Sequence, residues 1–383
     1  MKTAVSPRKR FTNKKIIAAA CKVVAVALTL GIGLGAAKLP RQATVPQAPQ
    51  IVAGDGVHGR IGMMWVPGGE FLMGTDSKLA QPNERPAHKV RVHGFWMDQH
   101  HVTNAEFRAF VKATGYVTTA EKKPDWETLK VQLPPGTPRP PADVLVAGAM
   151  VFTGTTGPAS LDDYAQWWRF APGANWRHPT GPNSTIDDKE DHPVVQVSYE
   201  DAQAYAKWTG KRLPTEAEWE FAARGGLEQA TYAWGNDFAP DGKQMANVWQ
   251  GQQQQAFPVV SPKAGGALGT SPAGTFPPNG YGLSDMTGNA WQWVADWYRA
   301  DAFEKEAKGG SPANPQGPAD SFDPSEPGTP VNAPKHVTRG GSFLCNESYC
   351  LSYRPSARRG TDPYTSMSHL GFRLVLDANG SKT

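Results

Sequence analysis

Three segments of the chain combine a helix-capping residue with apolar side chains spaced three or four residues apart. Residues 103–115 and 215–226 each begin with a Thr-x-x-Glu capping box, and residues 198–210 begin with a capping serine. The apolar stripes consist of Phe107, Phe110 and Val111, then Ala202, Tyr205 and Ala206, and finally Trp219, Ala222 and Ala223. A glycine follows each stripe, so the pattern predicts three short amphipathic helices.

Other apolar segments are shorter, and their residues alternate or run consecutively, which is typical of β-strands. These segments are GMMWVP at 62–67, EFLMGT at 70–75, KVRVHGFWMD at 89–98 and LGFRLVL at 370–376. The sequence around them is rich in turn residues, with long loops at 133–143 and 309–334. We therefore predict an α+β fold that is irregular and loop-rich.

The composition favours a domain with much ordered loop. The 383 residues include 40 Gly and 34 Pro, about a fifth of the chain, where the usual share is roughly 12%. Thirteen Trp and a hydrophobic fraction of 39% supply enough apolar surface for a sizeable core. No repeat of fixed period stands out. We predict a single domain over 61–377, a Pro/Gln/Ala linker at 38–60 and a tail at 378–383.

The N-terminal segment differs from the rest of the chain in charge. Nine Lys or Arg and no acidic residue occur in residues 1–41, so the net charge of +4 for the whole chain leaves −5 on the remainder. A mildly acidic body does not favour nucleic acid as a partner. The basic start and the apolar run at 16–37 predict that residues 1–37 are a signal peptide or an N-terminal membrane anchor.

Either interpretation places the body outside the cytoplasm, because the positive charges stay inside. We expect an exported protein, periplasmic or on the extracytoplasmic face of the membrane. It would contact the membrane only through residues 16–37, if they are not cleaved.

Two of the three cysteines, Cys345 and Cys350, lie five residues apart in GGSFLCNESYC, whereas Cys21 lies in the apolar N-terminal run. Two nearby cysteines in an exported protein are usually a structural disulfide. Two thiolates are also soft ligands that suit Cu(I), whereas zinc would need four ligands. Asn346 and Ser348 favour a turn that brings both sulfurs together. The spacing leaves a disulfide and a copper or redox pair open.

Several segments in order over residues 61–377 carry a resemblance to a known family. They are WVPGGEFLMGTD, VTNAEFRAFVKATGYVTTAE, GANWRHPTGPNSTI, DHPVVQVSYEDAQAYAKWTGKRLPTEAEWEFAARGG, YAWGN, FPPNGYGLSDMTGNAWQWVADWY, RGGSFLCNESYC and LGFRLV. The series resembles the formylglycine-generating enzyme (sulfatase-modifying factor) family. The cysteine pair with its Ser-Tyr neighbour resembles the aerobic, copper-dependent type. The resemblance implies the fold of that family, which is similar to the C-type-lectin-like fold.

The resemblance also implies an activity and the residues that carry it. The implied enzyme is an oxidoreductase that uses copper and O2 to oxidise a cysteine to Cα-formylglycine. The cysteine would lie in an unfolded or extended Cys-x-Pro-x-Arg segment of a sulfatase-like protein. Cys345 and Cys350 would be catalytic as the copper ligands. Ser342 and Tyr349 match family positions beside the oxygen pocket, and Trp291 matches an aromatic residue that lines it.

A few other positions matter for this comparison. His369 in SHLGFR stands where the family usually has Asn, and it is either a loop histidine or a residue facing the copper pocket, able to bind metal or move a proton. Trp176 is either a wall of the substrate groove or a core residue. Arg354, Arg358 and Arg373 match positions that we interpret as structural guanidinium anchors.

Calcium is the second metal that the resemblance implies. At one site Asn247 and the Val248 carbonyl match, but the family's Asp falls near Gly265, and a hard cation without its carboxylate loses affinity. The groups that match the other site are Asp285, the Gly288 and Ala290 carbonyls and Gln292, which replaces the usual Glu. The alternative is that both turns are held by their own hydrogen bonds.

Two other functions stay open from the sequence. The first is an exported oxidase on the same scaffold that acts on another substrate, such as a metabolite under maturation, and His369 motivates it. The second is a non-catalytic C-type-lectin-like binding module, in which Cys345 and Cys350 would form an inert disulfide.

Overall fold

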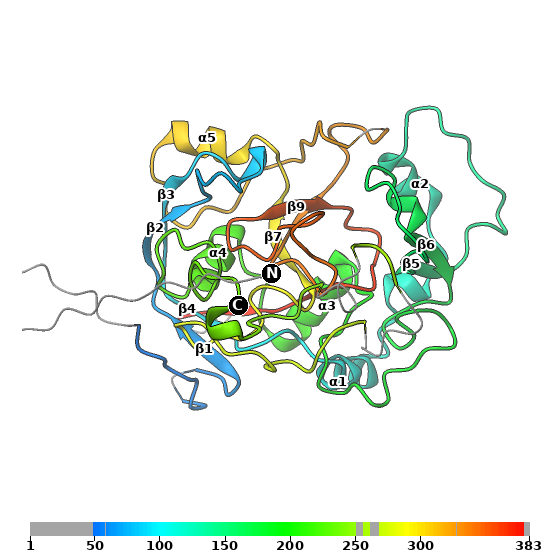
Figure 1. Cartoon of the computed structure of the whole chain (residues 1–383). Coiled ribbons are helices and arrows are strands. Elements are labelled where there is room, and N and C mark those ends of the chain that lie inside the picture. The colour runs from blue at the N-terminus through cyan, green and yellow to red at the C-terminus, as the bar shows by residue number, and fades with distance from the viewer. Residues whose placement is uncertain (1–48, 58, 250–255, 261–267, 327, 379–383) are drawn as a thin grey trace, which may run out of the picture. The chain divides into compact units, whose positions relative to one another are not determined.

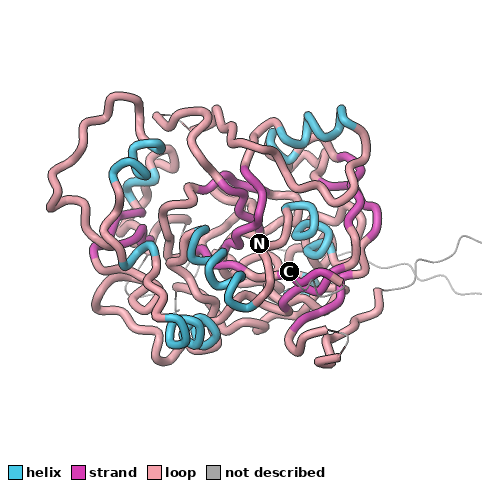
Figure 2. The backbone as a smooth tube through the Cα atoms, turned by 180° about the vertical axis from the view of Figure 1, so that it is seen from behind, coloured by secondary structure: helices cyan, strands magenta, loops and turns pink. Residues whose placement is uncertain are grey.

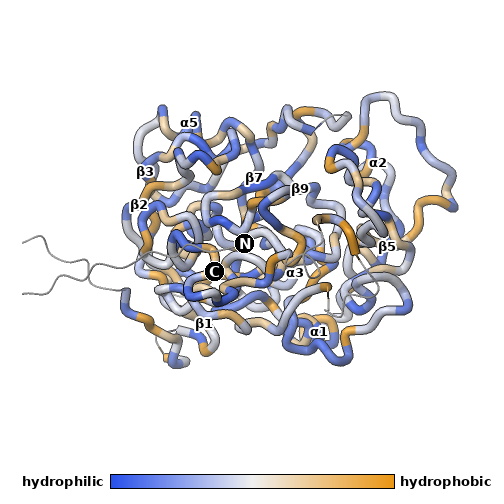
Figure 3. The backbone as a smooth tube through the Cα atoms, in the orientation of Figure 1, coloured by the Kyte–Doolittle hydropathy of each residue, from blue (hydrophilic) through white to orange (hydrophobic). Residues whose placement is uncertain are grey.

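The structure is a computed structural model that describes residues 49–57, 59–249, 256–260, 268–326 and 328–378. The predicted signal peptide or anchor and the tail beyond residue 378 lie outside the described residues. Within the described ranges, no helix is both long and apolar enough to cross a membrane. Hydrophobic stretches in this part of the chain are short and interrupted by hydrophilic residues (Figure 3).

The three predicted helices are confirmed, and each begins and ends where its capping residues indicate. They are α1 (Asn104–Thr114), α3 (Tyr199–Thr209) and α4 (Glu216–Arg224). The side chains of Thr103, Ser198 and Thr215 accept hydrogen bonds from the first turn, and Gly115, Gly210 and Gly225 end the helices in left-handed conformation. The structure adds α2 (Trp126–Leu129) and α5 (Ala302–Gly309), and short 3₁₀ turns at Pro82–Glu84, Thr119–Glu121, Lys130–Gln132, Tyr164–Gln166 and Pro240–Gly242.

The predicted strands form a three-stranded sheet, a hairpin and one strand of a further sheet, because the segments 89–98 and 370–376 each divide into two strands. The sheet has the order β1-β4-β11, with β1 at Met63–Val66, β4 at Phe95–Asp98 and β11 at Val375–Asp377, all antiparallel to their neighbours. The hairpin pairs β2 (Gly69–Met73) with β3 (His88–Val92). The first and last strands of the domain therefore lie on either side of β4 (Figure 1).

The boundary of the predicted linker differs from the structure. The N–H of Gly54 donates to the carbonyl of Met63, and the N–H of Trp65 donates to the carbonyl of Val52. Residues 52–54 thus extend the pairing at β1, although the linker was predicted to continue to residue 60. The segment is polar and rich in glycine, so its apolar pattern does not reveal this pairing.

Three of the four strands in the sheet at the centre of the domain were not predicted. Its order is β10-β7-β8-β9, with β10 (Leu370–Phe372) parallel to β7 (Trp291–Trp297), followed by β8 (His336–Arg339) and β9 (Arg358–Thr361). Five of the seven residues of β7 and all four of β8 are buried, so neither strand shows the alternation of a half-exposed strand. A further hairpin, β5 (Gly148–Phe152) with β6 (Trp168–Pro172), lies beside α2, and loops connect most elements (Figures 1 and 2).

Buried arginines link the central sheet to the helices. Arg358 and Arg339 both pair with Glu216 at 2.6 Å, and Arg354 pairs with Glu84 at 2.6 Å. Arg373 is fully buried and hydrogen-bonds to backbone carbonyls and to the side chains of Gln292 and His101. The structural role predicted for Arg354, Arg358 and Arg373 is confirmed by these contacts.

His336 on β8 makes the stability of the fold depend on pH. Its ring is 4% exposed and lies between Tyr199 and Trp297, with centroid distances of 3.5 and 3.9 Å. Burial lowers the pKa of His336 to about 4, and hydrogen bonds to backbone carbonyls only partly oppose this. Below pH 6.5 the unfolded chain takes up a proton that the folded chain does not, so stability falls as the pH falls towards 4.

We expect acidification from pH 7 to pH 5 to remove about 2 kcal/mol of unfolding free energy through His336 alone. Denaturant unfolding measured across this range should show a pH slope that decreases by about one proton in His336→Asn. An unchanged slope in that variant would contradict the assignment.

Candidate active site

The loop between the two cysteines is organised by local hydrogen bonds. Cys345 and Cys350 are disulfide-bonded, with their Cα atoms 4.7 Å apart and exposed fractions of 1% and 6%. The side-chain oxygen of Asn346 accepts from the N–H groups of Ser348 and Tyr349 at 2.8 and 2.9 Å, and the N–H of Cys350 donates to the Asn346 carbonyl. The turn predicted from Asn346 and Ser348 is confirmed, and it places the two sulfur atoms next to each other.

Two glycines let the chain enter this loop. Gly340 and Gly341 have φ angles of 90° and 70°, and a Cβ atom on Gly340 would lie 2.7 Å from the Met286 carbonyl oxygen. The Gly340 carbonyl accepts from the N–H of Gly288, and the N–H of Phe343 donates to the Asn289 carbonyl. The turn at 285–292 therefore positions the start of the cysteine loop.

The other residues matched to the oxygen pocket belong to, or lie next to, the buried cluster that contains the cysteines. Ser342 is fully buried, and its N–H donates to the Cys345 sulfur at 3.4 Å. Trp291 belongs to the same buried apolar cluster as both cysteines. Tyr349 packs against that cluster, and its ring stacks on Phe257 at a centroid distance of 4.6 Å. The structure thus brings the predicted catalytic groups other than His369 together around one buried sulfur pair.

The backbone of His369 is hydrogen-bonded to Trp291, at the point where β10 pairs with β7. Its carbonyl accepts from the N–H of Trp291, and its ring packs on Trp168 at a centroid distance of 4.7 Å. Burial, with a smaller contribution from the charge of Arg359, lowers the pKa of His369 to about 3, so the ring is neutral at neutral pH. Its Nδ1 atom is buried and has no hydrogen-bond partner among the described residues.

Trp176 does not line an exposed groove. Its side chain is 1% exposed and packs edge-on against Phe107, with a centroid distance of 5.2 Å, while the Arg177 guanidinium lies 4.2 Å from its ring. The prediction of a groove wall is contradicted by this burial, and the alternative of a core residue holds. Trp168 and Tyr349 are partly exposed, and Tyr349 belongs to the cysteine loop.

The residues matched to calcium lie in turns that contact the cysteine loop, and the Asn247 and Ala290 carbonyls already accept hydrogen bonds within the protein. The Asn247 carbonyl accepts from the N–H of Asn289 at 2.7 Å, and the Asn247 side chain donates to the Gly269 carbonyl. Gly265 lies outside the described residues, and the sequence from 242 to 284 has no Asp or Glu. The described ranges contain no group of three or more His, Cys, Asp or Glu placed to hold a metal.

Some residues that shape the site were not found from the sequence. Asn289 is fully buried with a φ of 62°, and it joins the turn at 285–292 to the cysteine loop. Trp167 and Phe257 pack on Tyr349, and Trp168 packs on His369. The dense aromatic sequence QWWRF around Trp167 and Trp168 was the available signal, although their contacts with residues about 180 to 200 positions away cannot be read from it.

The chain is similar in sequence to known proteins over most of its length. Residues 52–378 match the model of the sulfatase-modifying factor enzyme 1-like domain. The formylglycine-generating enzyme of Thermomonospora curvata is 46% identical over 82% of this chain and 93% of its own length. That of Mycobacterium tuberculosis is 47% identical over 82% and 96%. A mouse relative named inactive C-alpha-formylglycine-generating enzyme 2 is 35% identical over 84% and 87%.

The chain therefore belongs to the sulfatase-modifying factor family, to which the formylglycine-generating enzymes belong. Its identity to the named enzymes is higher than its identity to the inactive relative. The prediction of an oxidoreductase of this family is confirmed by these relatives.

Proposed function

We propose that this protein oxidises a cysteine in a Cys-x-Pro-x-Arg segment of a sulfatase-like protein to Cα-formylglycine, in a reaction that depends on copper and O2. The observation that carries the proposal is the buried Cys345–Cys350 pair, which a preorganised turn holds at one point. The high identity to named formylglycine-generating enzymes supports the same reaction.

The donor set around the cysteines fits Cu(I) once the disulfide is reduced. Two thiolates with their Cα atoms 4.7 Å apart can bind one soft ion, and the surrounding apolar residues keep water out. A bound copper ion would supply the centre at which O2 is reduced. The Ser342 N–H, which donates to the Cys345 sulfur, would stabilise that sulfur as a thiolate.

The electron balance sets what the assay must contain. Conversion of a CH2–SH group to an aldehyde with release of sulfide removes two electrons from the substrate. Reduction of O2 to water takes four, so a thiol reductant would supply the other two. We propose that the peptide binds in extended form across Trp168 and Tyr349, which are both partly exposed.

We also propose that the body works outside the cytoplasm. The disulfide at Cys345–Cys350 and the basic, apolar N-terminal sequence favour this location.

His369 supports a second candidate function, an exported oxidase on the same scaffold with a different substrate. Its buried Nδ1, which has no hydrogen-bond partner among the described residues, belongs to a neutral ring at a position where the family usually has Asn. Such a change beside the cysteine loop would alter which molecule the site accepts.

The test is incubation of the protein, loaded with Cu(I), in air with a thiol reductant and a synthetic Cys-x-Pro-x-Arg peptide. We expect an aldehyde to form only when copper is present, as followed by the mass of the peptide and by reaction with a hydrazide. Copper binding without any change in the peptide would favour the second candidate. Absence of copper binding would refute the copper-dependent proposal.

A further inference from the structure

Gln292 on β7 is completely engaged in hydrogen bonds within the protein. It is fully buried, and its side-chain oxygen accepts from the indole N–H of Trp219 at 2.9 Å and from Nε of Arg373 at 2.7 Å. Its side-chain nitrogen donates to the carbonyls of Asp285 and Met286 at 3.2 and 3.1 Å. Exchanging oxygen and nitrogen would make the nitrogen face two N–H donors, so the orientation of the amide is determined.

This orientation points an N–H donor, rather than an oxygen ligand, at the carbonyls of the turn. A calcium ion needs oxygen atoms around it, and the carboxylate usual in the family would supply two. Here the only side-chain oxygen of Gln292 is already shared by Trp219 and Arg373. The Ala290 carbonyl, another matched ligand, accepts from Nε2 of His101 at 2.9 Å.

Arg373 supplies a permanent positive charge at the same turn. Its guanidinium donates to the carbonyls of Ser284 and Asp285 at 2.8 and 2.9 Å. A guanidinium is a cation at neutral pH. A second cation beside this one would be repelled.

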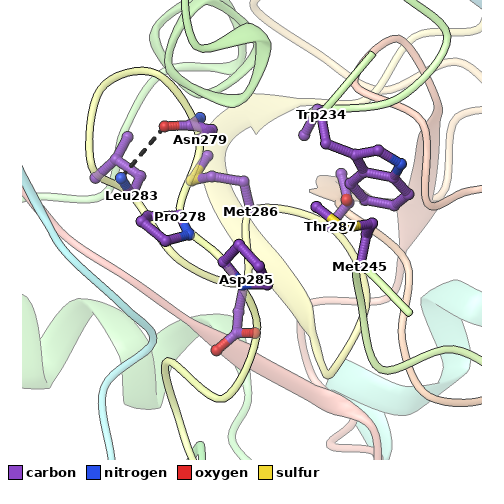
Figure 4. Close-up of a pocket in the computed structure, with 10 residues that line it drawn as sticks. Trp234, Met245, Pro278, Asn279, Leu283, Asp285, Met286 and Thr287 are labelled. Carbon is purple, nitrogen blue, oxygen red and sulfur yellow. Dashed lines mark hydrogen bonds between the residues drawn. The ribbon is translucent and has the colours of Figure 1, made fainter. Parts of the chain in front are cut away.

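Asp285 provides the matching negative charge. One carboxylate oxygen accepts from the N–H of Gly274 at 2.7 Å, and the other is buried without a hydrogen-bond partner in the described ranges. Figure 4 shows the Asp285 carboxylate turned away from Trp234 and Met245, which also line the small pocket there. Arg373 contacts Asp285 through the backbone carbonyl of that residue, so the guanidinium and the carboxylate lie close together at the same turn.

The turn at 285–292 positions the cysteine loop, because Gly288 and Asn289 form backbone hydrogen bonds with Gly340 and Phe343. We infer that hydrogen bonds from Gln292 and Arg373 replace calcium in this chain, so that the cysteine loop is positioned independently of the ion. The other matched site follows the same pattern, because the Asn247 side chain donates to Gly269 and Asn289, and the sequence from 242 to 284 has no carboxylate.

The experiment compares thermal unfolding of the full chain in EGTA and in millimolar calcium, together with calorimetric titration by calcium. We expect the wild type to show no stoichiometric calcium binding and the same Tm in both solutions. Gln292→Glu places a carboxylate oxygen against the Asp285 and Met286 carbonyls. Its Tm should fall by at least ~3 °C in EGTA and recover in calcium. Gln203→Glu, on the exposed side of α3, is the matched control and should respond to neither.

Two results would overturn the inference. One is stoichiometric calcium binding or a lower Tm in EGTA for the wild type, which decides the question even if Gln292→Glu does not fold. The other is a Gln292→Glu variant whose Tm neither falls in EGTA nor responds to calcium. Both readouts are independent of the proposed oxidation.

Discussion

Cys350→Ser is expected to lower the rate of aldehyde formation by at least ~1,000-fold, because one thiolate of the proposed copper pair is removed. A hydroxyl of serine is a hard, protonated group at neutral pH and does not replace a soft thiolate for Cu(I). The measurement is single-turnover conversion of a Cys-x-Pro-x-Arg peptide with copper and a thiol reductant. Cys345→Ser should behave in the same way.

Two controls separate a loss of chemistry from a loss of fold. Cys21→Ser is the same exchange at the third cysteine and should leave the conversion unchanged. In reductant, Cys350→Ser and the wild type should unfold at the same temperature, whereas without reductant the wild type should gain about 2 kcal/mol from closing the five-residue loop. Peptide conversion by Cys350→Ser at a rate close to that of the wild type would refute the role of the pair.

Glu216→Ala is expected to cost ~3–5 kcal/mol of unfolding free energy, because it leaves two buried guanidinium groups without their shared carboxylate. Arg358 binds both oxygens of Glu216, and Arg339 binds one, all at 2.6 Å. Burial alone would raise the pKa of Glu216, but Arg358 and Arg339 outweigh it and hold the pKa below its ordinary value. In the variant, Arg339 keeps the carboxylate of Glu220, whereas Arg358 keeps backbone carbonyls and two aromatic rings but no ion-paired carboxylate among the described residues.

The measurement is denaturant unfolding at neutral pH. Glu200→Ala, an exposed glutamate on α3, is the matched control and should change stability by less than ~0.5 kcal/mol. A cost below ~1 kcal/mol for Glu216→Ala would mean that the arginines find other partners and that the network is not a stabilising element.

The cysteine site shows which features can be predicted from neighbouring residues and which cannot. Asn346 and Ser348 predicted the turn, and the turn is formed by bonds that span at most four residues. The motifs also predicted the family, which the comparisons confirm. The burial of Trp176 could not be predicted, because a tryptophan suits a binding groove and a core equally well. Only its packing on Phe107, far away in the sequence, decides that it is buried.

The sequence by itself determined the elements whose signals are local. The caps and glycines of α1, α3 and α4, the alternating strands and the cysteine turn depend on neighbours a few residues apart. Only the tertiary structure decided the central sheet, the burial of His336, and the partners of Gln292 and Arg373. These depend on contacts across tens to hundreds of residues, and a fully buried strand or a satisfied buried amide has no periodic pattern that reveals it.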